Sequence, residues 1–146
     1  MSLVFLHPHT VRFAEVDAAG ISFFSRTFEA CHVAFEACLE AGGLPLQDIL
    51  AAGDFAMPLV AAEARYRRPT RLGERLVVEM RVETASERSV VFGYRILDPQ
   101  QEGDEGLRAT ARLTHAGLDR RTMRGAAIDP RIFAALRRAG VLAQGE

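Results

Sequence analysis

The feature that most constrains this chain is one long helical pattern near its N-terminus. Within residues 11–43, the part after Gly20 carries apolar residues at intervals of three and four, which places them on one side of a helix of about twenty residues. These residues are Phe24, Phe28, Cys31, Phe35, Cys38 or Leu39, and Gly42. Alanine and valine make the flanks apolar as well, so we expect a helix largely buried under a sheet and ended at Gly42-Gly43.

In the rest of the chain, apolar and polar residues alternate with the period of two that is typical of strands. We expect strands at Leu3 to Phe13, Pro58 to Arg68, Glu74 to Thr84, Ser89 to Leu97 and Gly106 to Gly117. Short polar links favour antiparallel hairpins between them. A short helix is expected at Leu46 to Ala52, and Asp129-Pro130 is expected to cap a final helix that ends near Arg138. This order predicts an α+β fold with an antiparallel sheet over one long helix.

Composition limits the class of protein. A chain of 146 residues is expected to form a single domain, 1–146. The net charge of −1 argues against broad attraction to nucleic acid or to anionic membrane. The absence of a long apolar run and of a leader pattern predicts a cytoplasmic protein that does not cross a membrane. All 18 basic residues are Arg, a side chain suited to binding phosphate where it clusters.

Several cofactor and nucleophile motifs are missing: the sequence has no G-x-S-x-G, no G-x-G-x-x-G and no Walker motif. Cys31 and Cys38 lie seven residues apart on the predicted helix, roughly 10 Å, which is too far for a disulfide, so both are expected to be core thiols. His115, on the inward face of the last strand, is expected to be a hydrogen-bonded core residue.

Polar residues with ligand chemistry allow two interpretations each. His7 and His9 could face a metal, but no other ligand is suitably spaced, which favours an exposed strand end. His32, with Glu29 and Glu36 one turn away on either side, could hold a metal or relay protons. The simpler interpretation is a polar helix stripe whose members bind each other or a neighbouring subunit.

Asp17 stands in the turn between the first strand and the long helix. The first turn of a helix leaves backbone N–H groups without intrahelical partners, and these are expected to face the loop that carries Asp17. A carboxylate beside free amide donors can form a reaction centre. From the local pattern alone, Asp17 can equally be a turn or cap residue.

The surrounding sequence carries a resemblance to a known family. Phe13-Ala14-Glu15-Val16-Asp17-Ala18-Ala19-Gly20-Ile21, followed by Phe23-Phe24, resembles the signature of the 4-hydroxybenzoyl-CoA thioesterase family of hotdog-fold enzymes. Residues 30–36 and 53–60 are similar, more narrowly, to the 1,4-dihydroxy-2-naphthoyl-CoA thioesterases of phylloquinone and menaquinone synthesis. One departure is Glu15-Val16, where many members have a further Asp and a Thr or Cys.

The resemblance implies a hotdog fold and the hydrolysis of an aromatic acyl-CoA thioester, best matched by 1,4-dihydroxy-2-naphthoyl-CoA or a 4-hydroxybenzoyl-CoA-like substrate. It implies that Asp17 is the catalytic acid, that the backbone amide of Phe24, in the first helical turn, polarises the thioester carbonyl, and that Gly20 lets the chain bend around substrate. Neither a cofactor nor a metal is implied.

The resemblance also implies binding residues and an assembly. Phe23 and the segment Phe55 to Val60, which includes Pro58, would grip the acyl ring. For the phosphates of CoA we expect Arg88, in a hairpin turn where the family tends to place basic residues, and Arg124, in the segment before the final helix. A homodimer is implied, with each site built across the interface, and tetramers are common in the family. Two alternatives stay open: a thioesterase that uses Glu29 or Glu36 as its acid, and a non-catalytic module that binds acyl-CoA or an acyl carrier.

Overall fold

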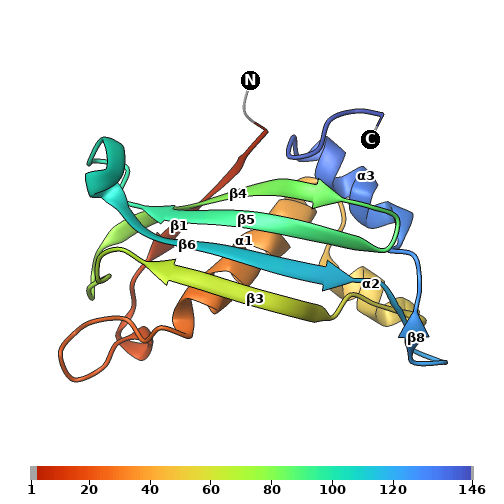
Figure 1. The fold of residues 1–146 in the computed structure, drawn as a ribbon, viewed down its shortest axis with the longest axis horizontal. Helices are drawn as coiled ribbons and strands as arrows, with labels where there is room; N and C mark the ends of the chain where they lie inside the picture. The colour runs from red at the N-terminus through yellow and green to blue at the C-terminus, as the bar shows by residue number, and fades with distance from the viewer. Residues whose placement is uncertain (1–2, 146) are drawn as a thin grey trace.

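The computed structural model describes residues 3–145 (Figure 1). The elements in chain order are β1 (Phe5–Thr10), η1 (Phe13–Glu15), α1 (Arg26–Ala41), α2 (Leu46–Ala52), β2 (Phe55–Ala56), β3 (Leu59–Tyr66), β4 (Arg75–Ala85), β5 (Ser89–Leu97), η2 (Gly103–Gly106), β6 (Leu107–Ala116), β7 (Leu118–Asp119), β8 (Arg124–Gly125) and α3 (Pro130–Arg138). No helix within residues 3–145 is long and apolar enough to cross a bilayer.

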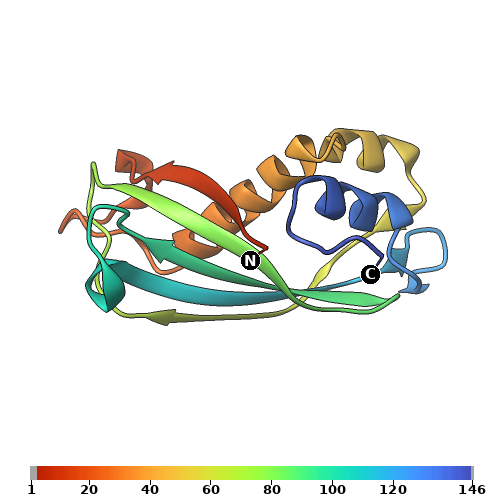
Figure 2. The ribbon, with the colours of Figure 1, turned by 90° about the horizontal axis from the view of Figure 1, so that it is seen from above.

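Five strands form one antiparallel sheet in the order β1-β4-β5-β6-β3. The sheet curves, and α1 and α3 lie on the same side of it (Figure 2). Strand β3 forms the lower edge of the sheet in Figure 1. A second, small sheet of β2, β7 and β8 lies beside α2 at the right-hand end of that view. The predicted α+β fold, an antiparallel sheet with a long helix against it, is confirmed.

The core lies between the sheet and α1. The alternating strand positions face it as the sequence predicts, because side chains two apart share one face of a strand. The largest buried side chains on the sheet include Met80, Phe92, Tyr94 and Leu113. Helix α1 contributes Ala30, Cys31, Ala34, Phe35, Cys38 and Leu39, which is the predicted apolar side beyond its first turn. The polar stripe predicted on the opposite side is solvent-exposed.

The end of α1 is fixed by two glycines. Gly43 has φ +81°, the left-handed conformation expected of a helix C-terminus. At Gly42 a Cβ atom would lie 2.1 Å from the carbonyl oxygen of Ala135, so only glycine lets α1 and α3 approach this closely. Helix α3 begins as predicted, with the Asp129 side chain accepting a hydrogen bond from the Arg131 backbone N–H.

Four details differ from the sequence expectations. The first strand ends at Thr10 rather than Phe13, because Phe13–Glu15 turn into a 3-10 helix capped by the Glu15 side chain, which accepts a hydrogen bond from the Arg12 N–H. Helix α1 begins only at Arg26, so Phe24 precedes it and is 70% exposed. Val33, on the expected apolar flank, is half-exposed. The small sheet has no sequence signal, since its strands are two residues long.

Candidate active site

The loop that carries Asp17 is tied to the rest of the protein by backbone hydrogen bonds. Asp17 N–H donates to the carbonyl of Ile21 at 3.0 Å, and Gly20 N–H donates to the carbonyl of Asp17 at 3.0 Å. Isolated bridges pair Val16 with Ser22, and Ile21 with Arg71. Gly20 has φ +76°, a conformation that side-chain-bearing residues rarely adopt. The loop is therefore a closed turn that requires Gly20 for its geometry.

The Asp17 carboxylate takes part in this turn through one of its oxygens. Oδ1 accepts hydrogen bonds from the N–H groups of Ala19 at 2.8 Å and Ile21 at 3.3 Å. Oδ2 has no hydrogen-bond partner among residues 3–145, and the side chain is exposed. The turn role considered for Asp17 is thus real. It also holds the carboxylate in one orientation with a free oxygen.

Phe24 lies in a tight turn just before α1, not in the first helical turn as expected. Arg26 N–H donates to the Phe23 carbonyl at 3.0 Å, which makes Phe24 and Ser25 the two central residues of the turn. Phe23 itself is held by its N–H, which donates to the Glu15 carbonyl at 2.9 Å. The Phe24 N–H has no acceptor within residues 3–145. The predicted free amide is therefore present, but in the tight turn that directly precedes α1.

Two residues that sequence reasoning missed support this turn. The Tyr66 hydroxyl, from the end of β3, donates to the Phe24 carbonyl. The Glu15 side chain accepts from His9 Nε2 at 2.9 Å, so this departure from the family pattern serves the loop rather than Asp17. A Tyr as the last residue of a strand was the available signal, but its partner is 42 residues away in sequence.

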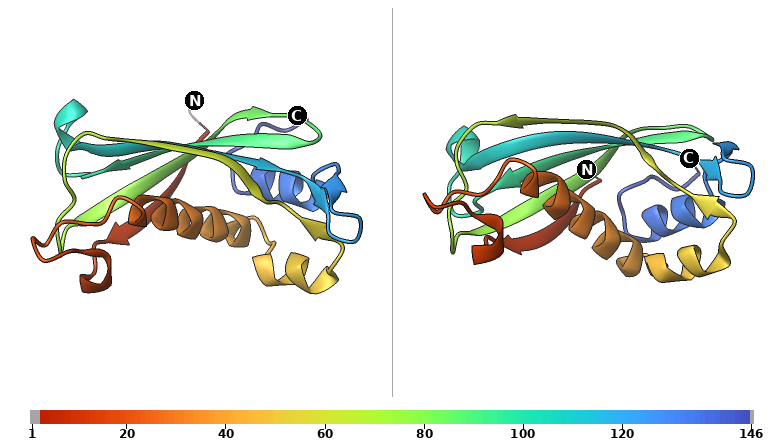
Figure 3. Two further views of the ribbon diagram at one scale, coloured as in Figure 1. Left: turned by 60° about the horizontal axis from the view of Figure 1, so that its bottom comes forward. Right: turned by 90° about the horizontal axis from the view of Figure 1, so that it is seen from below.

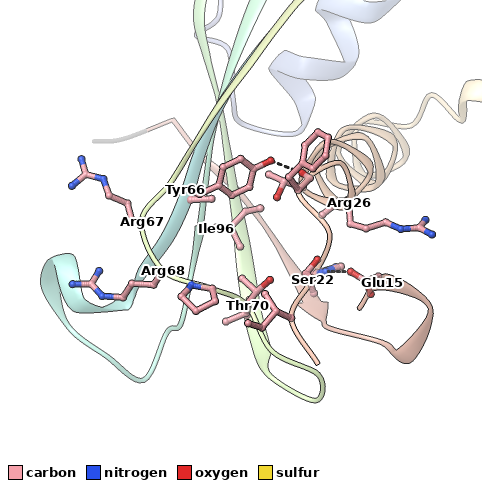
Figure 4. A pocket seen from close by; sticks show the side chains of 16 residues that line it. Glu15, Ser22, Arg26, Tyr66, Arg67, Arg68, Thr70 and Ile96 are labelled. Carbon is pink, nitrogen blue, oxygen red and sulfur yellow. Dashed lines mark hydrogen bonds and ion pairs between the residues drawn. The ribbon is translucent and has the colours of Figure 1, made fainter. Parts of the chain in front are cut away.

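A cleft of about 380 Å³ opens between this turn and the end of β3. In Figure 4 the Tyr66 ring reaches across it toward the start of α1, whereas Arg67 and Arg68 extend away on the other side. Glu15, Ser22 and Phe24 also line the cleft. Asp17 belongs to the loop that forms one wall, although its side chain is not among the lining groups.

A second cavity, of about 490 Å³, lies farther along α1. It is lined mainly by apolar side chains, among them Phe35, Leu46, Ile49, Leu50, Phe55, Met57 and Ile132. His32, Glu36, Gln47 and His115 are its polar lining residues. We call this cavity the apolar pocket. It includes Phe55, one of the predicted ring-binding residues, whereas Pro58, exposed just before β3, is not among its lining residues.

The two predicted phosphate-binding residues are neighbours. Arg88, in the turn between β4 and β5, donates from Nη1 to the Gly125 carbonyl at 3.4 Å, directly after Arg124. Arg120 and Arg121, from the β7–β8 hairpin, are also exposed and belong to the same corner. Sequence reasoning missed Arg120 and Arg121. We call Arg88 and the three Arg of residues 120–124 the basic corner. The small sheet joins this corner to Phe55, which pairs with Asp119.

Within one chain, the predicted site residues fall into two groups at opposite ends. Asp17, Gly20, Phe23 and Phe24 share the loop before α1, near the C-terminal end of β3. The other group is Phe55 in β2, Pro58 just before β3, Arg88 in the β4–β5 turn and Arg124 in β8; these segments lie at the end of the molecule where β3 begins (Figure 3). The eight residues of β3 separate the groups by roughly 25 Å. A single chain therefore does not assemble all of the predicted site.

The remaining candidates behave as structural groups. Burial raises the pKa of the Cys31 and Cys38 thiols to about 12, so both stay protonated core residues. Glu29 pairs with Arg26 at 2.8 Å instead of with His32. No cluster of three His, Cys, Asp or Glu within residues 3–145 could hold a metal ion.

Comparison with known proteins identifies the family. Residues 11–136 match the Thioesterase-like superfamily. The chain belongs to this superfamily. It is 30% identical, over 94% of both chains, to a protein from Picosynechococcus sp. named 1,4-dihydroxy-2-naphthoyl-CoA hydrolase. A protein of the same name from Synechococcus elongatus is 31% identical over 84% of this chain and 87% of its own length.

Solved structures place this superfamily member among hotdog thioesterases. A 1,4-dihydroxy-2-naphthoyl-CoA thioesterase from Synechocystis superposes with a TM-score of 0.84 at 29% identity, covering 92% of this chain and 96% of the other. A 1,4-dihydroxy-2-naphthoyl-CoA (DHNA-CoA) thioesterase from Staphylococcus aureus has a TM-score of 0.80 at 20% identity, over 92% of this chain and 89% of the other, and shares the fold. The predicted hotdog fold and the family resemblance are confirmed.

Proposed function

We propose that this protein, as a single hotdog domain, hydrolyses an aromatic acyl-CoA thioester to the free acid and CoA. The observation that carries the proposal is the loop before α1, in which a fixed carboxylate with one free oxygen, Asp17, shares a short closed segment with an unpaired backbone amide, Phe24. Thioester hydrolysis needs these two groups: one to activate or deliver the attacking oxygen, the other to stabilise the charge that develops on the carbonyl oxygen.

The chemistry of the loop follows from these positions. The thioester carbonyl would accept a hydrogen bond from the Phe24 N–H, and the positive end of α1 would add to the stabilisation of the oxyanion. A donor of this kind is typically worth about 2.7–4 kcal/mol in the transition state. Asp17 would act as a general base on water or attack directly to form a mixed anhydride. The thiolate of CoA is a good leaving group, so neither a metal nor a cofactor is part of the proposal.

The proposal includes a homodimer formed through β3. Within the described residues, β3 pairs with β6 on one side only, and its other edge carries exposed apolar side chains such as Val60 and Tyr66. An unprotected apolar edge strand is a template for pairing with another strand. Arg67 N–H donates to the Arg108 carbonyl, so by alternation along the antiparallel ladder the N–H groups of Ala62 and Ala64 point to the open edge.

Antiparallel pairing of β3 with its own copy would join the two groups of site residues. Such pairing places Tyr66 near Leu59 of the partner subunit, and therefore the loop of Asp17 and Phe24 near the partner's apolar pocket and basic corner. Each dimer would hold two such sites, related by a two-fold axis. Assembly of two dimers into a tetramer stays a prediction.

The substrate class follows from the second group of residues. The apolar pocket has a volume typical of small-molecule sites and would take an aromatic ring, with Phe55 in its wall. Pro58 follows Met57, which lines the pocket, and the exposed Phe23 would reach the ring only from the other subunit of the dimer. Arg88 and Arg124 would bind the phosphates of CoA. With the relatives named for 1,4-dihydroxy-2-naphthoyl-CoA, this favours that substrate, and therefore a role in quinone synthesis. Two free, buried cysteines fit a reducing compartment, and we propose the cytoplasm.

One observation favours a second candidate acid. Glu36 is exposed on α1 and lines the apolar pocket, where an acyl group would lie. A hotdog thioesterase that uses a helix carboxylate would place its acid in this way. A non-catalytic acyl-CoA binding module would keep the pocket and the basic corner but release no thiol.

The test is a thiol-release screen with aromatic and aliphatic CoA thioesters, run on the wild type, Asp17→Asn and its matched control Glu36→Gln. We expect turnover of aromatic thioesters by the wild type and by Glu36→Gln, and little by a folded Asp17→Asn. Loss in Glu36→Gln with retention in Asp17→Asn would assign the chemistry to the helix. Tight binding of CoA thioesters without thiol release would identify a binding module.

A further inference from the structure

His115 is a buried polar residue that the proposed chemistry does not use. It comes from β6, is only 5% exposed, and its ring lies in the wall of the apolar pocket. Phe35 stacks on the ring at 5.5 Å between centroids, and Phe92 meets it edge-on at 5.8 Å. These two aromatic contacts hold the imidazole in a fixed orientation.

The hydrogen bond of His115 determines its tautomer. Nδ1 lies 2.9 Å from the carbonyl oxygen of Met57. A carbonyl oxygen only accepts, so Nδ1 carries the proton and donates. Burial lowers the pKa of His115, and the nearby His32 acts in the same direction, so the ring is neutral at physiological pH. The other nitrogen, Nε2, therefore presents a bare lone pair.

Nε2 has no hydrogen-bond partner among the described residues. A buried acceptor without a donor is costly, and most such groups in folded proteins are satisfied by a protein group, a water or a ligand. The neighbouring polar group is His32, whose ring centroid is 5.7 Å away and which makes no hydrogen bond to it. The structure thus holds a neutral, oriented acceptor in the wall of a mainly apolar cavity, whose other polar lining residues are His32, Glu36 and Gln47.

We infer that His115 determines specificity by accepting, at Nε2, a hydrogen bond from a hydroxyl group on the ring of the bound acyl group. The inference rests on the proposed function and adds to it the residue that would recognise the ring hydroxyl of such a substrate. A bare lone pair selects a donor, and a ring hydroxyl is a donor that enters a mainly apolar pocket without charge. An unsubstituted ring would leave Nε2 unpaired, and sites built to bind a hydroxyl discriminate strongly against analogues that lack it.

The experiment compares ring-hydroxylated and unsubstituted ligands that share the same ring system. The kcat/KM values for 4-hydroxy-2-naphthoyl-CoA and 2-naphthoyl-CoA, and for the corresponding benzoyl pair, are measured for the wild type, His115→Phe and His115→Gln. Phe keeps the ring volume without the lone pair, whereas Gln restores an acceptor. We expect the wild type to prefer the hydroxylated member by roughly tenfold or more, His115→Phe to lose the preference, and His115→Gln to keep part of it.

Binding of the free acids makes the result independent of turnover. Two measurements report the same contact whether or not the protein hydrolyses thioesters. They are titration calorimetry with 4-hydroxy-2-naphthoate and 2-naphthoate, and the 15N chemical shift of His115 Nε2. We expect tighter binding of the hydroxylated acid and a shift of Nε2 with that acid alone. If the wild type shows no preference in either assay, or a folded His115→Phe retains it, the inference is overturned. Loss of hydrolysis with retained preference in binding would instead contradict only the proposed function.

Discussion

The two groups of site residues, at the two ends of β3, differ in the kind of chemistry they offer. The loop before the helix is polar, exposed and closed by backbone hydrogen bonds, and it carries Asp17 and the free Phe24 amide. The other end is an apolar pocket beside a corner rich in Arg. The proposed function assigns the reactive groups to the first end and the binding of an aryl-CoA to the second. In that proposal each working site takes one end from each of two copies of the chain.

The largest effect is expected at the loop, from removing one backbone hydrogen. Phe24 occupies the second position of a tight turn, where proline is favoured, so Phe24→Pro removes the N–H with little distortion. We expect kcat to fall about 10²–10³-fold, as for the loss of an oxyanion donor. Phe24→Ala keeps the N–H and is the control. Equal kcat values for the two variants in a thiol-release assay would assign the amide no catalytic role.

A change on β3 tests whether the two ends need each other. Ala62→Pro removes an N–H from the open edge and leaves the ladder to β6 intact, whereas Ala62→Val keeps that N–H. We expect the Pro variant to raise the dimer dissociation constant at least about tenfold and to lose activity in parallel with the dimer, because the monomer lacks half of each site. Light scattering and activity over a concentration series measure both. A fully active monomer would show that one chain is sufficient.

The basic corner should affect binding more than chemistry. Replacement of Arg88 and Arg124 by Gln removes two exposed cations that the proposal places against the phosphates of CoA. We expect KM to rise about tenfold with kcat changed little, and the dependence of KM on salt to weaken. The matched control is Arg75→Gln together with Arg81→Gln on β4, away from this corner. A similar rise in KM in the control would indicate only a general effect of net charge.

The smallest effect concerns stability at the apolar end. The folded-state pKa of His115 lies below its ordinary value of 6.5 because burial disfavours the charged ring. Below pH 6.5 the unfolded state therefore binds more protons than the folded state. The free energy of unfolding consequently decreases as the pH falls from that value. The slope is at most about 1.4 kcal/mol per pH unit. Urea unfolding near pH 7.5 and 5 should show a smaller decrease for His115→Phe than for the wild type; equal decreases would contradict the assignment.

How far the sequence predicts this molecule depends on how local each feature is. The long strands and α1 follow from the spacing of apolar residues, and the inward face of β6, with His115 on it, is correct. The partner of His115, the carbonyl of Met57, is 58 residues away and has no local signal. The start of α1 was misjudged because a tight turn at Phe24 continues the helical spacing without belonging to the helix.

The candidate site was predictable in composition but not in arrangement. Asp17, Gly20 and Phe24 lie in one continuous segment, so a family pattern can identify them. Arg88 was expected in a hairpin turn and Arg124 before the final helix, but the contact of Arg88 with Gly125, next to Arg124, depends on the small sheet, whose two-residue strands show no periodicity. The distance between the two groups of residues follows from the course of β3, which only the folded chain reveals.

Mixing two variants, each impaired in a different part of the site, tests the shared site most directly. One protein carries Asp17→Asn; the other carries Arg88→Glu and Arg124→Glu, and activity is measured at substrate concentrations well below KM after subunit exchange. If each site takes its acid from one subunit and its basic corner from the other, half of the dimers are mixed and each holds one intact site, so about one quarter of wild-type activity should return. If mixing restores no activity although light scattering and a tagged pull-down confirm mixed dimers, each chain uses its own two ends and the shared site is contradicted.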